Sequence, residues 1–215
     1  MNCKTGICCI FLCLPLAGFA SDTTYVHPRQ NGMFSVGVRS TVSLFSHGSF
    51  DETGYGAGGH FRLQIIDRIN TEWYLDVLST DIRQKAHRMD YHIGWSVMFY
   101  ILKPKGFTRL VTPYVVTGHC FDHTQIAPNG RPDERRTRWS SAVQMGAGTH
   151  FNITPKFDIS ITCQYMLHLG NELHAHVEDD GGVHIEEHSN AGWEGHFLVS
   201  ISANYKIARL WRSKK

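Results

Sequence analysis

Apolar and polar residues alternate with a period of two along most of this chain. Residues 88–101 show it most clearly, with Tyr91, Trp95 and Phe99 on one face and Asp90 and His92 on the other. Successive side chains of a β-strand point to opposite faces, so this pattern predicts a strand. Equivalent patterns predict eight strands in all, at residues 34–45, 55–66, 71–80, 88–101, 109–121, 139–153, 157–169 and 196–207.

The strand at residues 109–121 is the least regular of the eight. Leu110, Tyr114, Val116 and Cys120 share one parity, and we assign them to the apolar, outward face. Cys120 and Cys163 then lie on apolar faces of strands that are not neighbours, so we expect two free thiols rather than a disulfide.

The polar faces of the strands distinguish two kinds of barrel. In the four most regular strands these faces carry mainly Gly, Ser, Thr, Gln, Asn and His, with Lys206 the only lysine and no glutamate. A solvated face usually carries many charges, whereas a cramped lumen needs small hydrogen-bonding residues. The pattern predicts an all-β, eight-stranded antiparallel up-and-down transmembrane β-barrel. The alternative is a soluble barrel with its apolar face inward.

Short and long connections alternate between the predicted strands. Turns of three or four residues fall at 67–70, 103–106 and 154–156, and longer connections fall at 46–54, 81–87, 122–138 and 170–193. Outer-membrane barrels have short periplasmic turns and longer extracellular loops. This alternation predicts that both termini are periplasmic.

The first 20 residues have the features of a cleaved signal peptide. Lys4 precedes an apolar run, and small residues at Gly18 and Ala20 precede Ser21. We therefore expect a signal peptide at 1–20, a periplasmic segment at 21–32, the barrel at 33–211 and a basic tail at 212–215.

The net charge and the hydropathy of the chain fit this prediction. The net charge of +2 is close to neutral and does not indicate nucleic-acid binding. A mean hydropathy of −0.24 suits a barrel that exposes every second residue to lipid.

The chain resembles the small outer-membrane barrels, the group of the OmpA transmembrane domain and the OmpX-like proteins. The resemblance covers about residues 33–211 and rests on the alternation, on Thr-Pro-Tyr-Val at 112–115 and on Asn-Tyr-Lys-Ile at 204–207. Barrels of this group often end on an aromatic residue, whereas here the aromatic Trp211 is followed by four more residues. The resemblance implies a monomer in a Gram-negative outer membrane, in contact with lipid and lipopolysaccharide. We expect a non-enzymatic, structural role or a surface role with an extracellular protein partner.

Charged residues and histidines occur on the predicted lumenal faces. Uncompensated charge in so narrow a space is costly, so we expect Arg–carboxylate and His–carboxylate pairs that close the lumen. The alternative is a narrow channel or pH-sensitive path, because histidine titrates near neutral pH. The predicted polar core comprises Arg39, His60, Arg62, Asp76, Asp90, His92, His150, Asp158 and Lys206.

Two of the long connections have distinctive chemistry. Residues 170–193 contain four histidines, and the spacings between them suit Zn, Cu or Ni as a bound ion. The sequence therefore predicts a divalent metal as the cofactor of this loop. The alternative is a solvated acidic loop that binds no ion. Residues 122–138 contain four arginines that suit lipopolysaccharide phosphates, unless the loop is merely hydrophilic. The candidates are His174, His176, His184 and His188 for the metal, and Arg131, Arg135, Arg136 and Arg138 for lipopolysaccharide.

The stretch His-Ser-Asn-Ala-Gly at 188–192 resembles a motif of the PagL-like lipid A deacylases. That resemblance implies Ser189 as nucleophile, His188 as base and Glu194 or Glu186 as the orienting acid. The family keeps one residue between its histidine and serine, but here the two are adjacent and Glu187 stands in the matching position. A lipid A-modifying hydrolase is therefore the alternative to the non-enzymatic barrel.

Overall fold

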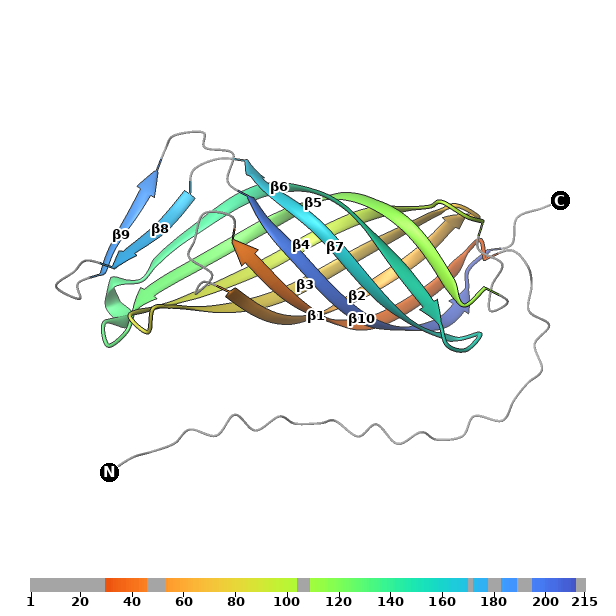
Figure 1. Cartoon of the computed structure of the whole chain (residues 1–215), viewed down its shortest axis with the longest axis horizontal. Coiled ribbons are helices and arrows are strands. Elements are labelled where there is room, and N and C mark those ends of the chain that lie inside the picture. The colour runs from red at the N-terminus through yellow and green to blue at the C-terminus, as the bar shows by residue number, and fades with distance from the viewer. Residues whose placement is uncertain are drawn as a thin grey trace, which may run out of the picture.

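The computed structural model describes residues 30–45, 53–103, 109–169, 172–177, 183–188 and 195–211. Eight strands form a closed antiparallel barrel in which each pairs with its neighbours and β10 closes onto β1 (Figure 1), which confirms the predicted fold class. No helix in these ranges is long and apolar enough to span a membrane. The barrel strands are β1 Met33–Phe45, β2 Thr53–Ile66, β3 Ile69–Ile82, β4 Ala86–Tyr100, β5 Val111–Pro128, β6 Arg136–Asn152, β7 Phe157–Leu169 and β10 Gly195–Arg209.

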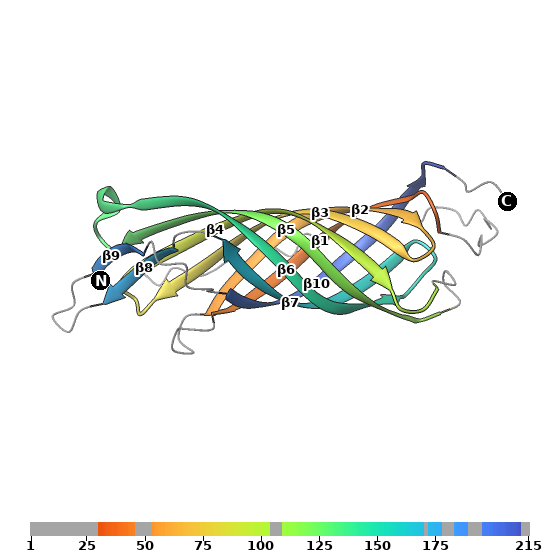
Figure 2. The same ribbon diagram turned by 90° about the horizontal axis from the view of Figure 1, so that it is seen from above.

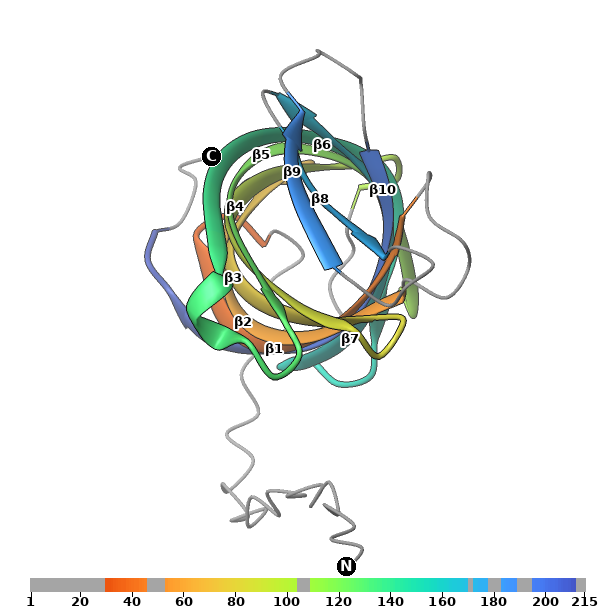
Figure 3. The ribbon, with the colours of Figure 1, turned by 90° about the vertical axis from the view of Figure 1, so that its left-hand side faces the viewer.

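Two further strands form a separate hairpin between β7 and β10. They are β8 Glu172–Val177 and β9 Val183–His188, and they pair only with each other. The hairpin lies across the end of the barrel opposite to the start of β1 and the end of β10 (Figures 1 and 3), and we call the end where β1 starts and β10 ends the terminal end. The predicted signal peptide and the 212–215 tail lie outside the described residues and stay predictions.

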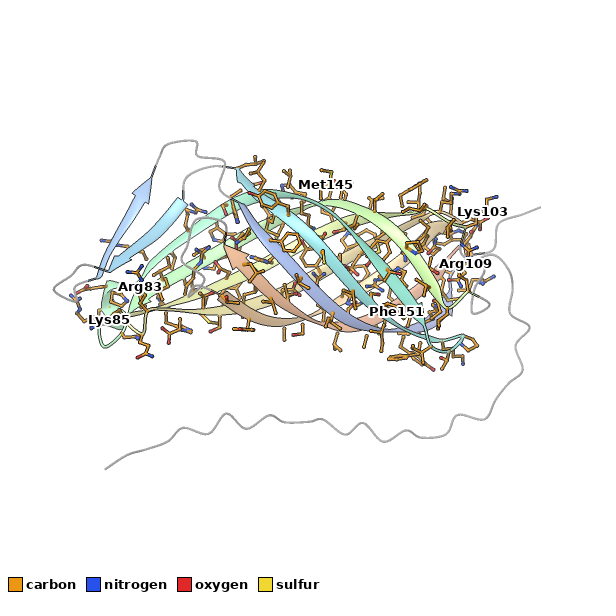
Figure 4. All side chains as sticks on the ribbon, viewed as in Figure 1. Arg83, Lys85, Lys103, Arg109, Met145 and Phe151 are labelled. Carbon is orange, nitrogen blue, oxygen red and sulfur yellow. The ribbon has the colours of Figure 1, made fainter. Side chains whose placement is uncertain are left out.

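The barrel is polar inside and apolar outside. Its lumen contains buried Arg, Asp, Glu, His, Ser and Thr side chains, while its outer surface exposes large apolar ones. Met145, in the middle of β6, has 72% of its surface exposed and points away from the barrel (Figure 4). A soluble protein would expose this apolar surface to water, so the arrangement suits a lipid surrounding.

The assignment of faces in β5 was wrong. Tyr114, Val116 and Cys120 are buried in the lumen, and the neighbouring Val115 and Phe121 are exposed on the outside. Both faces of this strand carry apolar residues, so hydrophobicity does not set the phase there. Thr112, Asp122 and Thr124 share the parity of Cys120, and an aspartate is costly on a lipid-facing surface.

Two lumenal glycines leave room for aromatic rings from neighbouring strands. A Cβ atom on Gly94 would collide with the hydroxyl group of Tyr74, and one on Gly148 would collide with the ring of Tyr114. The rings fill the space that the glycines leave, so the lumen is packed with side chains rather than open.

The connection lengths do not alternate as predicted. The β3–β4 connection is only residues 83–85 and the β5–β6 connection is 129–135, whereas β4 and β5 are separated by residues 101–110. Strands β3 to β6 instead continue beyond the ends of β1 and β10 (Figure 2). Arg83 and Gln84 adopt positive φ angles of 49° and 58°, which forms the tight turn between β3 and β4.

Candidate functional site

An ionic cluster occupies the middle of the lumen. Arg39 contacts Glu72 at 3.0 Å and Asp76 at 3.1 Å, and Arg62 contacts Glu72 at 2.6 Å and Asp158 at 3.4 Å. All five side chains are nearly inaccessible to solvent. Glu72 bridges the two guanidinium groups, so strands β1, β2, β3 and β7 are joined through one network.

The network continues towards the terminal end of the barrel. Lys206 lies 3.5 Å from Asp158, and Asn204 donates a hydrogen bond to the same carboxylate at 3.2 Å. His150 contacts Ser160 at 2.6 Å and the Tyr100 hydroxyl at 3.1 Å. In this part of the lumen the charges balance, because three cations face three carboxylates: Arg39, Arg62 and Lys206 against Glu72, Asp76 and Asp158.

A histidine cluster lies between the ionic cluster and the opposite end. The Nε2 atoms of His168 and His196 are 2.6 Å apart. Asp122 lies 3.5 Å from His92 Nε2 and 3.7 Å from His168 Nδ1. Four strands, β4, β5, β7 and β10, supply these residues, so the cluster spans the lumen from wall to wall.

The packing leaves little room for solutes. A cavity of about 30 Å³ lies near the start of β1, lined by residues including Arg62, His150, Asp158 and Lys206. That volume holds about two water molecules. The described lumen is therefore arranged as a closed polar core, and the ionic and histidine clusters form successive plugs along it.

Eight of the nine residues of the predicted polar core are buried, and Lys206 is half-buried with its ammonium group 3.5 Å from Asp158. Sequence reasoning missed Glu72 and Asp122. Glu72 shares the parity of Asp76 within the predicted strand at 71–80, so parity alone could have found it. Asp122 was left out because the predicted strand ended at residue 121.

Basic residues gather at the end of the barrel opposite to the terminal end. Arg83 and Lys85 lie in the β3–β4 turn (Figure 4), and the next turn is tied to it because Asn129 donates hydrogen bonds to the carbonyl groups of Gln84 and Lys85. We call the exposed set the basic rim: Arg83, Lys85, Arg131, Arg135 and Arg136.

The predicted arginines divide between the turn and β6. Arg131 and Arg135 lie in the turn, and Arg131 pairs with Glu134 at 3.0 Å. Arg136 and Arg138 belong to β6 and have the parity of its lumenal residues, and Arg138 is half-buried. Arg138 is therefore less accessible to a ligand outside the barrel than the other three.

The remaining candidates fall on or beside the hairpin. His174 and His176 belong to β8, and His184 and His188 belong to β9. Ser189 and Glu194 lie outside the described residues, so the suggested catalytic arrangement with His188 is untested. Where side chains are described, no three His, Cys, Asp or Glu residues group in a way that could hold a metal ion.

A different serine–histidine pair lies on the outer wall. His119 Nε2 is 2.6 Å from the hydroxyl group of Ser141, across β5 and β6. In the part of the chain that the structure describes, no carboxylate contacts His119 to orient its ring. The pair satisfies two polar groups on an apolar surface, but the orienting acid of a catalytic triad is missing from these contacts.

The fold matches known outer-membrane barrels. No family model matches the chain, and no curated protein matches it. The crystal structure of Neisserial surface protein A is 14% identical over 82% of this chain and 98% of that one, with a TM-score of 0.55. A major outer membrane protein from Thermus thermophilus is 8% identical over 81% of this chain and 99% of that one, with a TM-score of 0.54. These similarities establish the fold of a small eight-stranded outer-membrane barrel.

Proposed function

We propose that this chain is a non-enzymatic outer-membrane protein with a closed lumen, whose basic rim binds the phosphate groups of lipopolysaccharide. The observation that carries the proposal is the position of the rim. It lies beyond an outer wall of exposed apolar residues, on hairpins that continue past the ends of β1 and β10 (Figure 2), on the side where the phosphate-bearing polar part of a lipopolysaccharide leaflet would lie.

The chemistry of the rim suits phosphate. Arginine presents a planar set of donors that can form two parallel hydrogen bonds to a phosphate group. Arg131, Arg135 and Arg136 are exposed and lie close together in sequence around one turn, and the hydrogen bonds of Asn129 bring the Arg83–Lys85 turn beside them. Several cations can therefore meet one multiply phosphorylated headgroup.

The orientation follows from the same argument. If the rim meets lipopolysaccharide, its end of the barrel faces the cell exterior and the terminal end faces the periplasm, where we expect both termini. Lys103 and Arg109 lie at the terminal end (Figure 4), where they would face the phospholipid headgroups of the inner leaflet.

A binding experiment tests the proposal. The mature protein, folded in detergent micelles, is heated with and without lipopolysaccharide, and unfolding is followed by the mobility shift on gels. A ligand that binds only the folded state raises the unfolding temperature. We expect a rise with intact lipopolysaccharide, a smaller rise at high salt and none with a dephosphorylated form.

A matched pair of variants locates the site. R131Q/R135Q should lose most of the stabilisation, whereas K103Q/R109Q removes the same charge from the opposite end and should keep it. Equal stabilisation of both variants, or equal stabilisation by the dephosphorylated form, would contradict the proposed role of the rim.

A further inference from the structure

The β8–β9 hairpin brings histidines from two strands onto one face. In its antiparallel register His176 lies opposite His184, His174 opposite Glu186, and Glu172 opposite His188. Directly opposite residues share a face, and so do residues two apart in one strand. All six therefore share one face. The other face carries Leu173, Ala175, Val177, Val183, Ile185 and Glu187.

From this register we propose that the hairpin binds one zinc-like transition-metal ion through His174, His176, His184 and Glu186. This inference is independent of the basic rim. The four residues form two adjacent cross-strand pairs. Cβ atoms of opposite residues in such a ladder are about 4.5–5.5 Å apart, and successive residues on one face are about 7 Å apart.

Those spacings suit a metal ion. Zn²⁺ takes four ligands in a tetrahedron, with nitrogen at about 2.0–2.1 Å and carboxylate oxygen at about 2.0–2.2 Å. A His-x-His pair on one strand facing a histidine and a carboxylate on the next places four ligand-bearing residues at the corners of a small rectangle. Three imidazoles and one carboxylate favour Zn²⁺ or Cu²⁺ over Ca²⁺ and Mg²⁺, which prefer oxygen ligands alone.

The position of the hairpin also favours capture of an ion from solution. It lies across the barrel end opposite to the terminal end (Figure 3), on the same side as Arg83 and Lys85 of the basic rim (Figure 4). An isolated two-stranded hairpin is marginally stable in water. Because β8 and β9 pair only with each other, a cross-strand metal ion would stabilise their pairing directly.

Calorimetric titration with Zn²⁺ tests the proposal. The mature, full-length protein is used in detergent micelles without a polyhistidine tag. We expect one saturable site, and we expect the triple variant H174A/H176A/H184A to lose it while retaining the gel mobility of a folded barrel. Binding of Co²⁺ should give the intense visible absorption of a tetrahedral site.

Two adjacent glutamates provide the matched control. E186Q and E187Q make the same charge change one residue apart, but only Glu186 lies on the histidine face. E186Q should weaken Zn²⁺ binding at least about tenfold, and E187Q should leave it within about twofold. The proposal is overturned if the wild-type protein shows no saturable site, if the triple variant keeps it, or if the two glutamine variants weaken it equally.

Discussion

Arg62 and Glu72 are directly opposite each other in the β2–β3 ladder, and the guanidinium Nε donates to the carboxylate at 2.6 Å inside the lumen. Glu72 also accepts a hydrogen bond from Arg39 at 3.0 Å. One carboxylate therefore contacts two almost fully buried cations, and the other carboxylate partners are Asp76 for Arg39 and Asp158 for Arg62. Removing its charge leaves the three cations Arg39, Arg62 and Lys206 with only two carboxylates, in a space that water hardly enters.

We therefore expect E72Q to destabilise the barrel strongly. Loss of one partner from a buried ion pair costs about 3–5 kcal/mol, because the remaining charge is left uncompensated. Unfolding by urea from lipid vesicles measures the change. E134Q is the control, since Glu134 pairs with Arg131 at the exposed rim, where an ion pair contributes about 0–1 kcal/mol. Similar losses in the two variants would contradict the central role of Glu72.

The lipid-facing wall predicts a second result, at Met145. M145R places a charge on the outer surface near the middle of β6, and a charge at the bilayer midplane costs about 2–4 kcal/mol. Folding into vesicles should weaken by about that amount, whereas M145L should change it little. A negligible effect of M145R would contradict a lipid-facing position for this part of the wall.

The corrected phase of β5 predicts how the two cysteines react. Cys120 is fully buried in the lumen, while Cys163 is half-buried with the outward parity of Ile161 and Tyr165. A lipid-soluble maleimide should therefore label Cys163 in the folded barrel and should label Cys120 only after unfolding. Mass spectrometry of the C120S and C163S variants separates the two sites. Prompt labelling of Cys120 in the folded state would restore the original assignment of this strand.

The sequence predicted the barrel well where the two faces differ in chemistry. In β7, for example, Ile161 and Tyr165 alternate with Thr162 and Gln164, and no other phase is compatible with lipid. In β5 both faces carry apolar residues up to Phe121, so hydrophobicity does not show which face points into the lumen. Only Asp122, which follows, identifies the lumenal face. The outer parts of the β3–β4 and β5–β6 hairpins were also missed. Strands that extend beyond a membrane do not need one apolar face, so the alternation that predicts strands is absent there.

The lumenal pairs depend on register, which alternation does not determine. Parity puts Arg62 and Glu72 inside, but only the β2–β3 pairing brings them together. The histidine face of β8–β9 has the same origin, since the sequence gives the His-x-His spacing and the register supplies the opposing His184 and Glu186.

The enzyme alternative leads to a direct chemical test. Lipid A is analysed by mass spectrometry from cells with and without this protein, and from cells carrying S189A or S141A. We expect the same acyl chains in every case, because Ser189 departs from the deacylase spacing and the His119–Ser141 pair has no carboxylate among its described contacts. Loss of an acyl chain that depends on either serine would make the protein a hydrolase.

The closed lumen predicts that the barrel does not conduct ions. An eight-stranded barrel is just wide enough for its side chains, and here the ionic cluster and the histidine cluster span it in succession. Single-channel recording in planar bilayers should show no steady current. The charge-balanced variant R39A/R62A/E72A/D76A removes the bulk of the central plug, so any current should appear in it first. A steady current through the wild-type barrel would mean that the clusters open in the membrane, and the lumen would then be a path rather than a core.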